Sequence, residues 1–170
     1  MDLNTIVGII EILGIIAVAF GVGLGIKQLG LHRQQKRDLA IIECARSFEN
    51  KEFTEAYGLI TELSPGITIE EMKRMGPKYQ DAVLRTGMKF ETIGLLVYKN
   101  VVPIDAINDL VGDAAIQIWR IIEDFVIESR AARSHSTLFE WYQWLVDRLI
   151  EQAHRKPGPA FEVYKDWQAS

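Results

Sequence analysis

An apolar run near the start constrains the fold of this chain more than any other feature. Between residues 6 and 26 the only ionisable side chain is Glu11. An α-helix rises about 1.5 Å per residue, so the run spans roughly 31 Å, close to the ~30 Å hydrocarbon core of a bilayer. A buried helix of a small soluble domain carries a polar stripe where it meets water, and this run has none. The sequence therefore predicts a transmembrane anchor over residues 1–30.

A signal peptide and a buried soluble helix both fit the run less well. Ala17-Val18-Ala19 resembles a signal-peptide cleavage site, but the first residues, MDLNT, contain no Lys or Arg, and apolar residues continue beyond that point. A buried helix in a soluble domain is disfavoured by the missing polar stripe. We therefore expect a single membrane span.

Basic residues lie only on the C-terminal side of this span. Cytoplasmic flanks of membrane helices carry an excess of Lys and Arg, so we expect the bulk of the chain in the cytoplasm and the N-terminus outside. The bases expected to contact lipid headgroups are Lys27, Arg33, Lys36 and Arg37.

Small residues follow one face of the predicted span and form a stripe about 80° wide at 100° per residue. Such stripes let membrane helices approach closely, and a polar side chain at the edge can hydrogen-bond to a neighbouring helix. The sequence thus predicts a helix–helix contact; alternatively, the Glu11 side chain reaches the outer interface near Asn4 and Thr5. The contact residues are Glu11, Gly14, Ala17, Gly21 and Gly25.

The rest of the chain has helical spacing of apolar residues and no strand-like alternation, so the fold class is all-α. We expect the membrane helix to continue into a juxtamembrane helical segment over 31–64, followed by a compact cytoplasmic helical bundle over 65–155 and a C-terminal tail over 156–170. In the juxtamembrane segment the apolar stripe is Leu39, Ile42, Ala45, Phe48, Phe53, Ala56, Ile60 and Leu63.

Turn and cap residues divide the bundle into helices. Thr68 and Glu71 form a capping-box pattern, and Pro77 and Pro103 suit the first turns of the next two helices. The helix after Pro77 is expected to reach about Asn100, with apolar positions that include Val83, Met88, Ile93, Leu96 and Val97.

The last two helices are predicted from apolar stripes as well. The helix after Pro103 is expected to reach about Ala132, and its stripe is Ile107, Val111, Ala115, Ile118, Trp119, Ile122 and Val126. Ser134 or Ser136 is expected to cap the final helix. The apolar positions of that helix are Leu138, Trp141, Tyr142, Leu145, Leu149 and Ile150.

The segment from Lys89 to Leu145, together with the anchor, resembles a family of small bacterial single-span membrane proteins with a cytoplasmic helical domain of unknown function. The shared positions are Phe90, Glu91, Gly94, Leu96, Val97, Ile104, Trp119 and Arg130, and Asn100 stands where a glycine is expected. The resemblance implies this architecture and a bacterial origin, which together with the basic flank predicts the bacterial inner membrane. It implies no activity.

The sequence offers no convincing catalytic, metal or cofactor pattern. His32, His135 and His154 stand apart from other ligand residues, and Gly21, Gly23 and Gly25 lack the spacing of a dinucleotide fingerprint. Cys44 is the only cysteine, so it forms no intrachain disulfide, and its helical position favours a structural thiol. The net charge of −4 argues against nucleic-acid binding. No small-molecule substrate is evident.

Four of the seven phenylalanines are followed by glutamate. In a helix such a glutamate lies beside a buried ring, so Glu91 and Glu140 are expected to be half-buried and to form structural ion pairs with Arg120 or Arg130. Aromatic residues near the C-terminus exceed what one helix face buries, which predicts a partner surface. Its residues are Trp144, Phe161, Tyr164 and Trp167.

These features favour a non-enzymatic, membrane-anchored interaction module that self-associates or joins a larger membrane assembly. The alternative is an oligomeric pore-forming or membrane-disrupting effector of the toxin or phage-defence type, in which Glu11 from several copies lines a polar lumen. An enzyme with Glu91, Glu140 and Arg130 in a cleft is the third class. The partners expected are thus the lipid bilayer and further protein chains.

Overall fold

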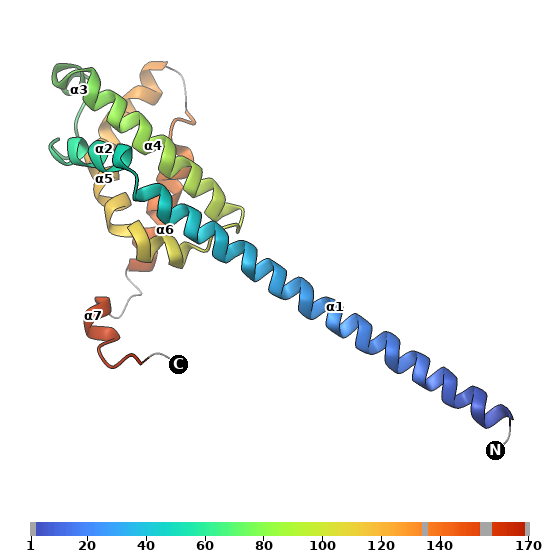
Figure 1. The fold of residues 1–170 in the computed structure, drawn as a ribbon. Helices are drawn as coiled ribbons and strands as arrows, with labels where there is room; N and C mark the ends of the chain where they lie inside the picture. The colour runs from blue at the N-terminus through green and yellow to red at the C-terminus, as the bar shows by residue number, and fades with distance from the viewer. Residues whose placement is uncertain (1–2, 134–135, 154–157, 169–170) are drawn as a thin grey trace. The chain divides into compact units, whose positions relative to one another are not determined.

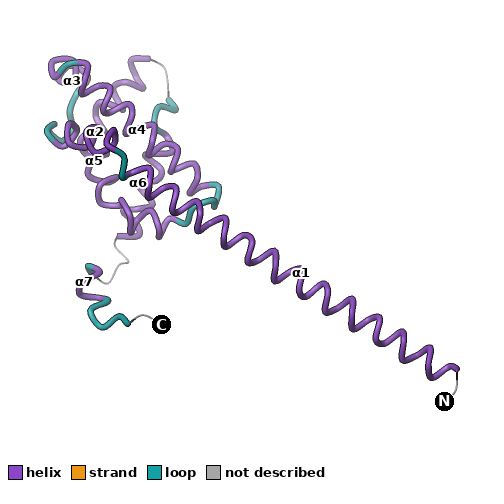
Figure 2. The backbone as a smooth tube through the Cα atoms, in the orientation of Figure 1, coloured by secondary structure: helices purple, strands orange, loops and turns teal. Residues whose placement is uncertain are grey.

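The computed structural model describes residues 3–133, 136–153 and 158–168, with the side chains of 3–19, 22–26, 33 and 133 left aside. Every regular element in these ranges is a helix, which confirms the all-α class (Figure 2). The helices are α1 (Leu3–Phe48), α2 (Lys51–Thr61), α3 (Ile69–Met75), α4 (Pro77–Tyr98), α5 (Ile104–Arg133), α6 (Glu140–Ala153) and α7 (Ala160–Val163).

The chain divides into two compact units, Met1–Leu39 and Ala40–Ser170. The first unit is helical from Leu3 onward, so the apolar run and its basic flank share one unbroken helix. Among the side chains that the structure describes, no helix is long and apolar enough to cross a membrane. The predicted span over residues 6–26 lies outside those side chains except for Phe20 and Gly21.

The second unit begins at Ala40, well before the bundle boundary predicted at residue 65. The last turns of α1 contribute the buried Cys44 and the partly buried Ala40, Ile41 and Phe48 to the core. The stripe predicted for this segment is out of register by one or two residues at its start, because Leu39 and Ile42 are exposed. The predicted juxtamembrane segment is therefore divided, and most of it belongs to the bundle.

Helix α4 is the central element of this unit, since it contacts α2, α3, α5 and α6 (Figure 1). Helix α5 contacts α2, α3 and α6 in addition to α4. The core between them is a single cluster whose largest fully buried side chains are Tyr142, Phe90, Phe139, Ile60, Met72, Ile107, Ile118 and Ile122. The predicted stripe of α5 is confirmed, because its members are buried or pack against this cluster.

The local signals for helix ends are largely confirmed. Thr68 and Glu71 form the capping box at the start of α3, and Pro77 occupies the first turn of α4. Asn50 caps α2 by accepting from the Phe53 N–H at 2.7 Å. Asn100 closes the α4–α5 turn with a φ of 56°, a left-handed conformation that Asn tolerates better than most residues.

The start of α6 differs from the prediction. The helix begins at Glu140, so Ser136 does not cap it and Leu138 precedes it, while Ser134 lies outside the described residues. Phe139, directly before the helix, has a φ of 55° and is buried. The first turn of α6 is capped by a side chain of another helix, α4.

One apolar position of α4 also differs from the prediction. Met88 is 60% exposed, although Val83, Ile93 and Val97 of the same predicted set are buried. The core therefore takes a narrower face of α4 than the sequence pattern indicates.

Candidate functional site

The carboxylate of Glu91 lies at the N-terminus of α6. Its Oε2 accepts from the Tyr142 N–H at 2.8 Å, which satisfies one of the backbone donors left free in the first turn. Burial raises the pKa of this carboxyl, the backbone N–H groups of Tyr142 and Trp141 and the nearby Arg130 oppose the shift, and Glu140 adds to it. Glu91 of α4 therefore caps the N-terminus of α6, a role that in many helices belongs to a Ser directly before the first turn.

Arg130 holds the chain just before α6. Its Nε donates to the Leu138 carbonyl at 2.8 Å and its Nη1 to Gln143 Oε1 at 2.7 Å. Among the described residues the ion pairs involve other side chains, so the expected pairing of Glu91 or Glu140 with Arg120 or Arg130 is replaced by these hydrogen bonds. Glu140 and Arg120 are exposed. The sequence thus identified two residues that matter here, Glu91 and Arg130, and the charge of Arg130 acts on Glu91, but it did not predict the hydrogen-bond partners of either residue.

Tyr142 is the buried centre of this arrangement. Its ring stacks on Phe90 with centroids 4.8 Å apart and meets Trp119 edge-on at 5.1 Å. Its hydroxyl donates to the Ala115 carbonyl at 2.8 Å, and burial raises its pKa well above the ordinary value. The phenol is therefore a neutral structural donor that ties α6 to α5.

Two glycines of α4 allow α6 and its preceding turn to approach closely. A Cβ at Gly94 would lie under 3.0 Å from the Trp141 carbonyl oxygen, and a Cβ at Gly87 would lie under 3.0 Å from the ring of Phe139. Both distances are far below van der Waals contact. The positions that carry the sequence resemblance gather around the start of α6 and hold it in place; they include Phe90, Glu91, Gly94, Trp119 and Arg130.

Lys89 is a residue of α4 whose side chain reaches the C-terminal end of α1 and the first turn of α2. Its ammonium donates to the Ser47 carbonyl and lies 4.8 Å and 4.6 Å from the ring centroids of Phe48 and Phe53. Burial lowers its pKa, while Glu52 opposes that shift. A cavity of about 200 Å³ adjoins it, lined also by Asn50, Glu52, Arg85 and Thr86. These contacts fix the first two helices of the bundle against α4.

A larger cavity of about 320 Å³ lies between the α4–α5 turn and α6. Tyr98 and Trp144 form an aromatic wall, and Arg148 pairs with Glu151 at 2.8 Å on its polar side. Trp144 packs edge-on against Tyr98, with centroids 5.9 Å apart, so this member of the predicted partner surface is partly buried. In the ranges that the structure describes, no three His, Cys, Asp or Glu residues are placed to hold a metal ion.

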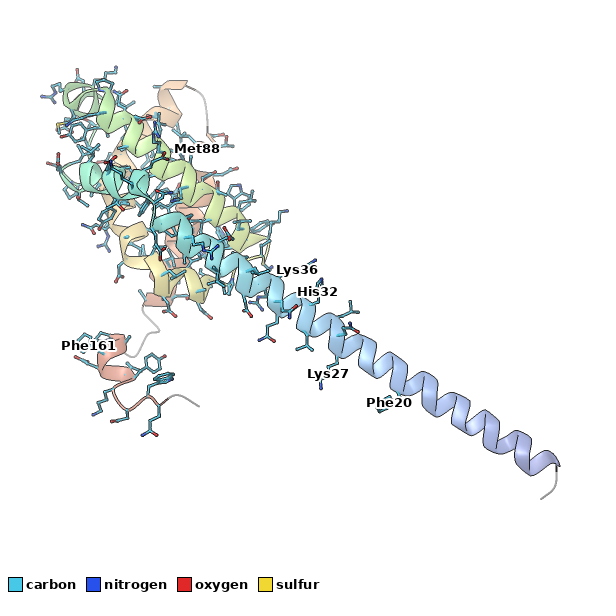
Figure 3. All side chains as sticks on the ribbon, in the orientation of Figure 1. Phe20, Lys27, His32, Lys36, Met88 and Phe161 are labelled. Carbon is cyan, nitrogen blue, oxygen red and sulfur yellow. The ribbon has the colours of Figure 1, made fainter. Side chains whose placement is uncertain are left out.

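The remaining predicted site residues are exposed wherever the structure describes their side chains. Phe161, Tyr164 and Trp167 are 76%, 65% and 73% exposed, and Figure 3 shows Phe161 on α7. Lys27 and Lys36 project from α1 in the same view, and Arg37 is exposed as well, while Arg33 lies outside the described side chains. Of the residues predicted to form a helix–helix contact in the membrane, Gly21 is described. The others lie outside the part of the chain whose side chains the structure describes; they are Glu11, Gly14, Ala17 and Gly25.

Cys44 is buried, and burial, with Glu43 nearby, raises the pKa of its thiol. A raised pKa keeps the group in its unreactive protonated form. The interpretation of Cys44 as a structural thiol agrees with this position.

A domain of unknown function (DUF4760) matches residues 9–149, most of the chain. The chain belongs to the DUF4760 family. The match begins inside the apolar run and ends at Leu149 in α6, so it covers most of both units and the residues described above as contacting Tyr142. Neither the curated proteins nor the solved structures contain a match to the chain.

Sequence reasoning missed several residues of this DUF4760 domain that position α6. The Tyr142–Ala115 hydrogen bond and the Gln143–Arg130 hydrogen bond join positions that no spacing rule connects. Gly94 was visible only as part of the resemblance. A glycine in the middle of a long helix lowers helix stability by about 1 kcal/mol relative to alanine. A glycine at such a position therefore suggests that another helix packs closely against it.

Proposed function

We propose that this DUF4760 protein is a non-enzymatic interaction module anchored in the bacterial inner membrane, with its bundle in the cytoplasm. The apolar run of residues 6–26, continued by exposed bases on the same helix, carries the proposal. Its Ile, Leu, Val and Phe side chains contribute roughly 4–8 kcal/mol in favour of insertion, against about 2.5–3.5 kcal/mol for one charged residue at mid-helix. The balance favours the bilayer even if Glu11 inserts charged.

The contacts of Glu91 and Arg130, two of the positions that carry the family resemblance, favour a binding module over an enzyme. Glu91 is a side chain suited to acid–base chemistry and Arg130 one suited to stabilising negative charge, and both are engaged in holding the N-terminus of α6. Catalytic acids and bases need a free position for a reacting group within hydrogen-bond reach. A bundle whose polar residues position its own helices instead presents a fixed outer surface, which suits protein–protein contact.

Membrane fractionation tests the anchor directly. The intact chain, produced in bacteria, is expected to remain in the high-speed pellet after washes with high salt and alkaline carbonate, and to enter solution only with detergent. Ile16→Arg places a second charge at the centre of the run and is expected to shift the chain toward the supernatant, whereas Ile16→Leu leaves it in the pellet. An intact chain that is soluble and monodisperse without detergent would overturn the proposal.

A further inference from the structure

The outer face of α4 carries a row of apolar side chains that the bundle leaves partly exposed. Leu84, Met88, Leu95 and Tyr98 are 45%, 60%, 38% and 50% exposed, and Figure 3 shows Met88 projecting away from the bundle. With the partly buried Glu91 they follow spacings of four, three, four and three residues. That spacing is the a/d pattern of a coiled-coil seam. We call these five positions the α4 seam.

The α4 seam borders the face that α4 gives to the core, and two of its members also touch α6. The Glu91 carboxylate accepts from the Tyr142 N–H, and the ring centroids of Tyr98 and Trp141 lie 4.6 Å apart. Val83, Phe90, Ile93 and Val97 are buried on that inner face. Single exposed apolar residues are ordinary on protein surfaces and need no explanation. An ordered row along about 21 Å of helix is different, because a helix with one satisfied face has no structural need for a second apolar face.

We infer that the α4 seam is the contact surface for a second copy of this chain, packed antiparallel about a two-fold axis. A two-fold interface requires one patch to be complementary to itself when reversed. The seam meets this requirement about a point between Lys89 and Phe90. Reversal sets Leu84 opposite Leu95 of the second copy and Met88 opposite the methylene groups of Glu91, whose carboxylate remains bonded to the Tyr142 N–H.

The ends of the seam are also complementary in the antiparallel arrangement. Asp81, one turn before Leu84, comes opposite the hydroxyl of Tyr98 and beside the ammonium of Lys99 of the second copy. Its carboxylate is 60% exposed, with a salt bridge of 2.7 Å to Arg85. The ammonium of Lys78 lies over the ring of Tyr79, away from the seam. A parallel pairing would instead set Asp81 against Asp81 and Lys99 against Lys99.

The surface area of the α4 seam determines the conditions under which two copies pair. Stable interfaces bury about 1,200–2,000 Å² in total, and two heptads of one helix fall short of that. The inference therefore rests on the proposed function: a shared membrane holds copies at high effective concentration, which makes a weak contact populated. Detached bundles in dilute solution are expected to remain monomeric.

Cysteine cross-linking of the full-length chain in membranes tests the pairing and its direction. In a Cys44→Ala background, Met88→Cys places the two thiols within about 5 Å along the axis, and Leu84→Cys places them about 16 Å apart. A short bifunctional maleimide is expected to yield roughly tenfold more dimer with Met88→Cys than with the exposed α5 control Asp113→Cys. Leu84→Cys alone gives little dimer, and co-expressed Leu84→Cys and Leu95→Cys chains give heterodimer.

Further variants separate the possible failures. Adding Leu95→Glu to Met88→Cys is expected to reduce the dimer to the Asp113→Cys level without changing the circular-dichroism melting curve in detergent. Efficient dimer from Leu84→Cys alone overturns the antiparallel arrangement. Equal dimer from Met88→Cys and Asp113→Cys in a membrane-bound chain overturns the α4 seam and leaves the anchor standing. A chain that appears in the supernatant overturns the anchor, and with it the tethered pairing.

Discussion

At the scale of single residues, the sequence pattern predicts the partial burial of Glu91 but not its hydrogen-bond partner. Its place beside Phe90 predicts a partly buried carboxylate, and the structure agrees. The choice of partner depends on which helix end arrives nearby, and that end lies about fifty residues later at Tyr142. Arg130 was an equally reasonable partner from composition. A backbone N–H carries no signature in the sequence, so the hydrogen bond to α6 was not predictable from spacing.

Substitution of Glu91 separates its hydrogen bond from its charge. Glu91→Ala removes the acceptor at the start of α6, and loss of a helix cap costs about 1 kcal/mol in free energy of unfolding. Glu91→Gln keeps an acceptor oxygen and is expected to lose much less at neutral pH. Thermal unfolding of the membrane-extracted chain, followed by circular dichroism, measures both. Equal destabilisation by the two variants would contradict the cap assignment.

The pH dependence of these variants has a definite sign. Burial raises the pKa of Glu91 above its ordinary value of 4.5, so the folded state binds a proton more readily than the unfolded state. The stabilisation linked to this group is therefore fully present below pH 4.5 and is lost as the pH rises through the folded-state pKa. Relative to Glu91→Gln, the wild-type chain is expected to lose stability over that window. A relative gain with rising pH would show that the pKa is lowered instead.

At the scale of elements, helix boundaries set by local chemistry were predictable and those set by tertiary contacts were not. The capping box of Thr68 and Glu71 and the prolines at 77 and 103 act within a few residues, and the structure places helix starts there. Helix α6 begins where Glu91, Arg130 and the close approach at Gly94 hold the chain. The segment 40–48 likewise takes its register from the core, which buries Cys44 and leaves Ile42 exposed.

Two glycine-to-alanine substitutions test this distinction between local and tertiary effects. At Gly94 a methyl group would overlap the Trp141 carbonyl oxygen, so Gly94→Ala forces α6 away and is expected to cost about 1–3 kcal/mol. At Gly58 in α2 nothing lies within 4 Å, so Gly58→Ala is expected to stabilise by roughly 0.5–1 kcal/mol through helix propensity alone. Midpoints of chemical unfolding give both values. If Gly94→Ala is as mild as Gly58→Ala, the close α4–α6 contact is wrong.

At the scale of the whole molecule, the proposed function assigns a different role to each of the two units. Met1–Leu39 supplies the apolar run and the basic flank, and Ala40–Ser170 supplies a bundle whose partly buried polar side chains hold its own helices. Two of the surfaces left for other molecules are the small-residue stripe in the proposed span and the α4 seam. If both contacts exist in one assembly, each raises the local concentration for the other.

Glu11 offers the test of the contact predicted within the proposed span. If its side chain hydrogen-bonds to a neighbouring helix, Glu11→Leu removes that bond and shifts chemical cross-linking in membranes from oligomer toward monomer, whereas Glu11→Gln, which keeps donor and acceptor groups, shifts it less. An oligomer distribution unchanged in Glu11→Leu would assign Glu11 to the outer interface instead. The same proteins in liposomes address the pore alternative, because ion flux that Glu11→Ala abolishes would indicate a lumen lined by this carboxylate. Oligomers without flux at any protein-to-lipid ratio would favour the interaction module, since association through the span then serves to assemble bundles and not to open a path for ions.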